Sequence, residues 1–232
     1  MAVDRKKKRS VDPAAEAMLE KTSSAGIETA FDRHDLQGRR CPFGELGMCC
    51  RICDMGPCRI SYTDRGNKRG VCGATASTIT ARNLVRQVAA GAAAHSDHGH
   101  DVVKTLLMTA KGEAQGYAIK GERRLLALAK EWGVATVGRR VEDVAAELAS
   151  LALAQFNQQE GEIKYPALRA PKATVDNWRR LGILPVGVEH EIVETLHRTH
   201  EGVDADYVNL LMHGFRTSLA DGWAGSMLAT DF

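Results

Sequence analysis

The chain lacks the long apolar run that a membrane-spanning helix requires. None of its apolar stretches approaches roughly 18 residues, and the basic first residues are not followed by the apolar core of a secretory signal. Strong net charge is also missing, because 31 Lys and Arg residues face 29 Asp and Glu residues and the only basic block is Arg5–Arg9. We therefore expect a cytoplasmic protein with no transmembrane segment and no nucleic-acid partner.

Cysteine is absent from most of the sequence but crowded in one short part of it. All six cysteines lie between Cys41 and Cys72, and the other 200 residues contain none. A reducing compartment disfavours three disulfides, whereas thiolates are soft ligands for zinc, copper(I) and iron-sulfur clusters. The crowding therefore favours a metal centre.

The cysteine spacing, C-x7-C-C-x2-C-x4-C-x13-C, separates into a set of four and a remaining pair. Cys50, Cys53, Cys58 and Cys72 supply the four thiolates of one complete site. Cys41 and Cys49 are two short of the four that a cubane cluster or a tetrahedral zinc needs. Two copies of the chain, related by a two-fold axis, could each supply this pair to a shared site. Such a shared centre would hold the two copies together as a homodimer.

The neighbours of the cysteines bear on which metal they bind. Glycines such as Gly56 and Gly70 let the backbone approach closely and direct N–H groups at cluster sulfurs. Arg51 and Arg59 either bring positive charge to an anionic cluster or are ordinary solvated side chains. We favour iron-sulfur over zinc, although C-x2-C also opens many structural zinc sites. A zinc-stabilised binding module whose basic head contacts nucleic acid, or an iron-sulfur redox sensor, remains the alternative.

Six segments of the chain are distinctive: CPFGELGMCCRICDMGPCRI at residues 41–60, RGVCGA at 69–74, ARNL at 81–84, GAAAHSDHG at 91–99, HRTHEGVD at 197–204 and DGWAGSMLATD at 221–231. They resemble the N-terminal region of anaerobic nickel-iron carbon monoxide dehydrogenases. The resemblance implies that Cys50, Cys53, Cys58 and Cys72 hold a 4Fe-4S cluster, called cluster B. It also implies that Cys41 and Cys49 hold a second 4Fe-4S cluster, cluster D, which is shared across the dimer.

The resemblance further implies an oxidoreductase that converts CO and water into CO2, two protons and two electrons. The electrons would leave through clusters C, B and D to a ferredoxin-like acceptor. In the family the nickel-iron-sulfur active cluster, cluster C, is bound by residues beyond the last position of this chain. We therefore expect no catalytic residue here, no α/β domains, and a segment that is inactive alone.

His95 and His98 match the beginning of a line of histidines that is thought to carry protons in that family. The next two matching positions are Asp101 and Lys104, and His100 is out of register. The alternative is that these histidines are capping or partly exposed polar residues at a bend between helices. His197 and His200 are expected at the surface, because a metal site needs further convergent ligands.

Hydrophobic periodicity predicts a mainly α-helical chain. We expect a basic head and short helix in residues 1–30, the cluster-binding segment in 31–75, and a helical remainder in 76–232. Helices are predicted at 11–21, with Asp12 as N-cap, at 79–88 and 102–107 as a hairpin ending near Gly112, and at 122–132, 141–156, 175–181, 189–199 and 205–219.

A few other residues have expected structural roles. Strand-like alternation is weak, with 135–137 the best example, so we expect no sizeable sheet. Asp204, Asp206 and Asp221 lack the spacing of a calcium loop and are expected to be helix caps or solvated charges. Trp178 and Trp223 are expected in the core.

Overall fold

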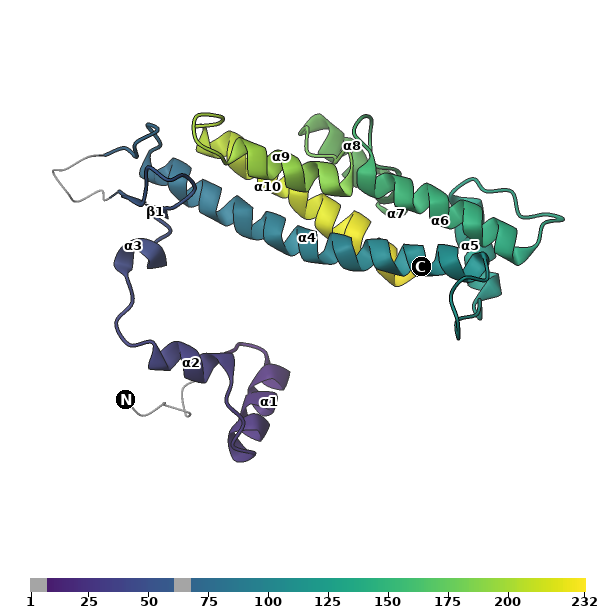
Figure 1. Ribbon diagram of the computed structural model, residues 1–232, viewed down its shortest axis with the longest axis horizontal. Coiled ribbons are helices and arrows are strands. Elements are labelled where there is room, and N and C mark those ends of the chain that lie inside the picture. Colours follow the sequence, from purple (N-terminus) through teal and green to yellow (C-terminus); the bar gives the residue numbers. More distant parts are fainter. Residues whose placement is uncertain (1–7, 61–67) are drawn as a thin grey trace. The chain divides into compact units, whose positions relative to one another are not determined.

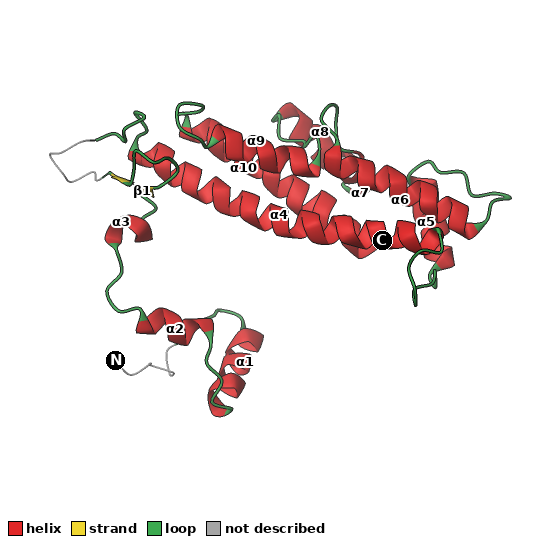
Figure 2. Cartoon of the chain, viewed as in Figure 1, coloured by secondary structure: helices red, strands yellow, loops and turns green. Residues whose placement is uncertain are grey.

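The computed structural model describes residues 8–60 and 68–232, and it divides the chain into two compact units, 1–46 and 47–232 (Figure 1). Most of the basic block at Arg5–Arg9 therefore lies outside the described residues. The fold is mainly α, as predicted (Figure 2).

The first unit contains α1 (Pro13–Ser24), α2 (Ala30–Leu36) and α3 (Pro42–Glu45). Asp12 is the N-cap of α1, with its carboxylate accepting from the Ala14 N–H, which confirms the predicted cap. The helix continues to Ser24, three residues beyond the predicted end. Helices α2 and α3 are too short to give a periodic signal and were not predicted.

The second unit is organised around α4 (Ala76–Ala110), a single helix of 35 residues (Figure 1). The predicted hairpin is wrong, because the chain does not turn between residues 88 and 102. No proline interrupts this stretch, and an isolated glycine such as Gly91 weakens a helix without ending it. The stop near Gly112 is confirmed, since that glycine follows the C-cap Lys111 with φ of +74°.

The other elements of this unit are α5 (Glu122–Glu131), α6 (Val141–Asn157), α7 (Lys164–Arg169), α8 (Lys172–Arg180), α9 (Val188–Arg198), α10 (Tyr207–Leu219), the π-helical segment η1 (Ala220–Ser226) and α11 (Met227–Asp231). Of these, α6, α9, α10, η1 and α11 pack on α4, while α5 packs on α6, α7 on η1 and α8 on α7. The five helices predicted after Gly112 are present, each beginning within three residues of its predicted start. Helices α7 and α11 and the π-helical geometry of η1 were not predicted.

Extended structure is confined, among the described residues, to one small antiparallel pair formed by β1 (Cys49–Cys50) and β2 (Cys58–Arg59). The expectation of no sizeable sheet is therefore confirmed. The alternating stretch at 135–137 forms no strand and lies in the connection between α5 and α6, where Val137 is 93% exposed.

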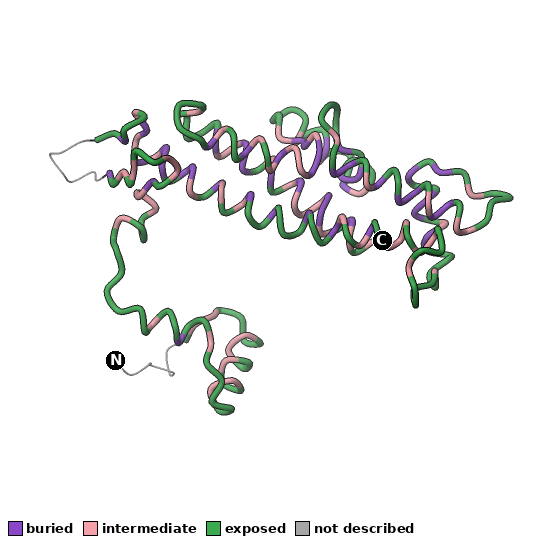
Figure 3. The backbone as a smooth tube through the Cα atoms, viewed as in Figure 1, coloured by how far each residue is buried: buried purple, intermediate pink, exposed green. Residues whose placement is uncertain are grey.

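The main core lies where α4, α5 and α6 meet, and buried residues follow the inner faces of these helices (Figure 3). Val144 and Leu148 are fully buried on α6, as predicted, but Leu151 is 38% exposed and Ala152 takes the next buried position. Ala145, Ala149 and Phe156 are buried as well, so the inner face of α6 is centred to one side of Val144, and Leu151 lies at the edge of that face.

A smaller cluster contains the two tryptophans that were expected in the core. Trp178 and Trp223 meet with ring centroids 5.6 Å apart and pack against Ala170, Val175 and Leu184. Among the described residues, no helix is both long enough and apolar enough to cross a membrane.

Candidate metal centre

Four cysteines of the second unit line one cavity. Cys50 on β1 lies opposite Cys58 on β2 in the strand register, and Cys53 is in the turn that joins these strands. Cys72 enters from the loop that precedes α4. The hairpin and the start of α4 thus bring together the same four cysteines that the spacing grouped as one set.

Close backbone packing around this cavity depends on glycine. A Cβ atom at Gly56 would lie 3.1 Å from the carbonyl oxygen of Cys50 and 3.3 Å from that of Cys53. A Cβ atom at Gly70 would lie 3.5 Å from the sulfur of Cys58. A larger residue at Gly56 would force the cysteine-bearing backbone apart.

The positive charge beside the cavity comes from Arg82 on α4. Its side chain is 2% exposed, and its Nη1 atom donates to the Cys72 sulfur at 3.7 Å. Arg51 and Arg59, which the sequence suggested for this role, are both exposed. In the sequence, Arg82 stands out only as part of the matching segment at residues 81–84. The signal that could have identified it is its position between Ile79 and Val85, on the face of α4 that is buried.

Burial and nearby donors act differently on two of the thiols. Burial raises the pKa of Cys50, outweighing the hydrogen bond from the Ile52 backbone and the charge of Arg82. Burial also acts to raise the pKa of Cys72, but the Ala74 backbone N–H and Arg82 together outweigh it and lower that pKa. The thiolate form, which binds metals, is therefore favoured at Cys72.

The chemistry of the cavity fits an iron-sulfur cluster. The four cysteines surround it, with apolar Ile79 in its wall and the Arg82 Nε buried without a partner in the described structure. Four soft thiolates beside a buried cation fit an anionic iron-sulfur cluster.

The remaining cysteines belong to different units. Cys49 is half-buried on β1, and its carbonyl oxygen accepts from the Asn83 side-chain amide at 3.0 Å. The same amide donates to the carbonyl oxygen of Gly47 at 2.9 Å, so α4 fixes the backbone that carries Cys49. Cys41 is in the first unit, where it is exposed and directly precedes α3.

His95 and His98 are exposed near the middle of α4. No bend between helices exists at this point, so that part of the alternative is wrong, but both histidines are exposed polar residues, as it expected. The Nδ1 atom of His95 pairs with the carboxylate of Asp221 on η1 at 2.5 Å, so the expectation that Asp221 is a cap or a solvated charge is also wrong. His100 points elsewhere and packs edge-on against the Phe156 ring.

The other singled-out polar residues lie around α9 and α10. Asp206 is the N-cap of α10, as predicted. His197 and His200 are both exposed and pair with Glu194 and Glu201.

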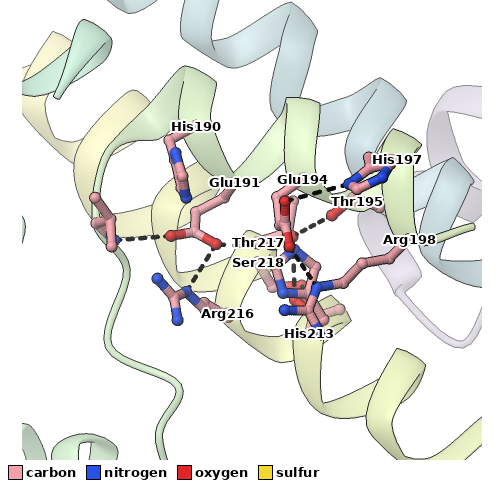
Figure 4. A network of polar contacts seen from close by, with 12 residues as sticks. His190, Glu191, Glu194, Thr195, His197, Arg198, His213, Arg216, Thr217 and Ser218 are labelled. Carbon is pink, nitrogen blue, oxygen red and sulfur yellow. Dashed lines mark hydrogen bonds and ion pairs between the residues drawn. The ribbon is translucent and has the colours of Figure 1, made fainter. Parts of the chain in front are cut away.

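A buried charged cluster joins α9 to α10, and the sequence did not reveal it (Figure 4). Glu191 is fully buried, accepts from the Val186 backbone at 2.7 Å, and lies 2.7 Å from the Nε atom of Arg216. His213 lies 3.8 Å from the same carboxylate. Burial lowers the pKa of His213, and the opposing attraction of Glu191 does not reverse this.

Known proteins resemble this arrangement over nearly the whole chain. Carbon monoxide dehydrogenase 1 of Methanosarcina mazei is 55% identical over 223 residues, and the carbon monoxide dehydrogenase of Rhodospirillum rubrum is 43% identical over 225 residues. Each comparison covers 96% of this chain, and the chain spans 35% of the length of either relative.

Solved structures show the same fold. A nickel-free carbon monoxide dehydrogenase from Thermococcus sp. AM4 matches 99% of this chain and 36% of its own, with a TM-score of 0.86 and 46% identity. A chain from an acetyl-CoA synthase/carbon monoxide dehydrogenase, described with nickel-containing clusters, matches with a TM-score of 0.86 and 37% identity. Residues 48–232, which include the four-cysteine cavity and all of α4, match the Prismane/CO dehydrogenase family, and the chain belongs to that family.

Proposed function

We propose that this chain is an electron-transfer segment of an anaerobic nickel-iron carbon monoxide dehydrogenase, whose reaction converts CO and water into CO2, protons and electrons. The observation that carries the proposal is the single cavity lined by Cys50, Cys53, Cys58 and Cys72 beside the buried Arg82. Family membership and similarity to named carbon monoxide dehydrogenases support it. We assign no residue of this chain to the family's nickel-iron-sulfur cluster.

Those four cysteines are the proposed ligands of one 4Fe-4S cluster in each chain, and such a cluster, when bound, stores and releases single electrons. The protein's part is to supply thiolates, to limit water and to balance charge. Buried Ile60 and Ile79 pack against the cysteine segment, which keeps its inner side apolar. Arg82 offsets part of the negative charge that four thiolates bring.

Cys41 and Cys49 are the proposed ligands of a second 4Fe-4S cluster, shared between two copies of the chain. Two thiolates from each copy complete a four-thiolate site on a two-fold axis. The Asn83 amide, which binds the carbonyl oxygens of Gly47 and Cys49, would keep one of these ligands in place. We propose a homodimer that passes electrons to a ferredoxin-like acceptor.

His95 and His98 are proposed to begin a proton relay. The hydrogen bond between His95 and Asp221 supports this role, because a carboxylate bound to one ring nitrogen orients the imidazole and leaves the other nitrogen available. We propose no further members of the relay, since Asp101 and Lys104 occupy the next matching positions.

Metal analysis of the anaerobically purified chain tests the proposal. We expect about six iron atoms per chain, four from the private cluster and two from a half share of the common one, with matching sulfide. An electron paramagnetic resonance signal should appear on reduction with dithionite. About four iron atoms would remove the shared cluster from the proposal. Zinc without iron would overturn it and favour the zinc-stabilised binding module.

A further inference from the structure

Arg82 is a buried cation without a carboxylate partner in the described part of the chain. It lies on α4 and is 2% exposed. Its Nη2 atom donates to the Asp204 carbonyl oxygen at 2.6 Å, its Nη1 atom donates to the Cys72 sulfur at 3.7 Å, and its Nε atom has no partner in the described structure. Burying a charge is costly unless an opposite charge compensates it. In the described part of the chain, the Cys72 sulfur that Arg82 contacts is the group that can supply this charge.

We propose that Arg82, through its charge and its hydrogen bond to Cys72, raises the reduction potential of the cluster held by Cys50, Cys53, Cys58 and Cys72. This inference rests on the proposed function. Reduction adds one negative charge, so the reduced cluster is attracted to a nearby cation more strongly than the oxidised one. A hydrogen bond to a ligand sulfur acts in the same direction, because it withdraws electron density from the thiolate.

Location distinguishes Arg82 from the other charges near the cavity. Arg51 lies between two of the ligands in sequence, but it is exposed, and water and salt screen an exposed charge. Glu201 lines the same cavity with the opposite sign, and it is exposed and paired with His200. Arg82 alone among these three is shielded from solvent, so its charge should dominate the local potential.

A redox titration of the reconstituted full chain, followed by electron paramagnetic resonance, tests this role. At a fixed potential, Arg82→Gln should lower the ratio of reduced to oxidised cluster about tenfold, which corresponds to about 59 mV for a one-electron couple. Arg82→Lys keeps the charge and should restore most of the ratio. Arg51→Gln, which removes an exposed charge of the same sign, should leave the ratio close to that of the unchanged chain.

The unchanged chain provides a test that does not depend on how a variant folds. When arginine is labelled with ¹⁵N, electron-nuclear double resonance of the reduced cluster should detect a nitrogen coupling, and Arg51→Gln should retain it. No coupling in the unchanged chain would overturn the inference.

The titration can also contradict the inference. It would be overturned by an unchanged ratio in Arg82→Gln with full iron content, or by equal shifts in Arg82→Gln and Arg82→Lys, which would indicate a purely structural role. A chain that binds no iron and sulfide at all would instead refute the proposed function.

Discussion

The Nδ1 atom of His95 lies 2.5 Å from the Oδ1 atom of Asp221, which joins the middle of α4 to η1. A carboxylate at this distance favours the ring tautomer whose proton is on Nδ1, leaving Nε2 able to accept a proton. The contact involves a π-helical turn, a geometry found frequently at functional sites. It gives the proposed relay a defined first member.

Asp221→Asn should weaken the preference of the His95 ring for the tautomer with its proton on Nδ1. The neutral amide holds the Nδ1 proton less strongly than a carboxylate does, so the tautomer population should move toward Nε2–H, as measured by ¹⁵N nuclear magnetic resonance of labelled histidine. The free energy of unfolding should change by less than about 1 kcal/mol, since His95 is largely exposed. Asp97→Asn, an exposed change on the same helix, is the control. An unaltered His95 tautomer in Asp221→Asn would count against the relay.

Replacing two different glycines of α4 by alanine should change the stability of the fold in opposite directions. A Cβ atom at Gly99 would lie 2.9 Å from the Gly225 carbonyl oxygen, a backbone atom of η1, whereas a Cβ atom at Gly91 meets nothing within 4 Å. Gly99→Ala should therefore destabilise the fold by about 1–3 kcal/mol. Gly91→Ala should stabilise it by about 0.5–1 kcal/mol, because alanine favours the helix. Urea denaturation followed by circular dichroism measures both, and changes of the same sign would be inconsistent with this packing.

His213 should make stability depend on pH near neutrality. Burial lowers its pKa in the folded state, so the unfolded chain binds the proton more readily. The stability that the neutral His213 ring contributes is fully present above the pKa of about 6.5 in the unfolded chain. It is lost as the pH falls from there through the lowered pKa of the folded state. Glu191 and Glu194 oppose this effect by attracting the charged ring, while Arg198 and Arg216 reinforce it.

We expect the free energy of unfolding to fall between about pH 7 and pH 5, by at most about 1.4 kcal/mol per pH unit from this one group. His213→Gln should flatten the profile. Denaturant titrations across this range provide the measurement, and identical slopes for His213→Gln and the unchanged chain would exclude His213 as the cause.

Cys49→Ser should remove the proposed shared cluster and keep the private one. It removes a ligand of the shared cluster and leaves all four ligands of the private one, so iron should fall from about six to about four per chain. The dimer should weaken, as measured by analytical ultracentrifugation under anaerobic conditions. Cys53→Ser is the matched comparison, since it should cost the private cluster while the dimer remains. Retention of both dimer and iron in Cys49→Ser would rule out a shared centre.

Local signals in the sequence were sufficient for much of the fold. Asp12 followed by Pro13 marks the start of α1, and Gly182, which has a positive φ, directly follows the C-cap of α8. Gly202 is not a stop of the same kind, because it lies three residues beyond Thr199, the C-cap of α9. Spacing alone also grouped the four cysteines that the structure brings to one cavity.

Features that depend on tertiary packing were not predictable in the same way. Nothing local distinguishes one continuous α4 from a hairpin, because the polar stretch around His95 is compatible with either an exposed helical face or a turn. Arg82 and Asp221 acquire their roles from partners more than 120 residues away, the Asp204 carbonyl in one case and His95 in the other. A one-dimensional pattern carries no information on such partners unless the fold is known.

Because α4 is unbroken, it fixes how far residues near its two ends are rotated about the helix axis relative to one another. Arg82 beside the cysteines and His95 beside Asp221 are 13 residues apart on one rod, which sets an axial separation of about 20 Å. Inserting one residue between them would turn His95 by about 100° around the helix axis relative to Arg82. The length of this stretch is therefore as much a part of the molecule's chemistry as the residues at its ends, and substitutions should be tolerated in it far more readily than insertions or deletions.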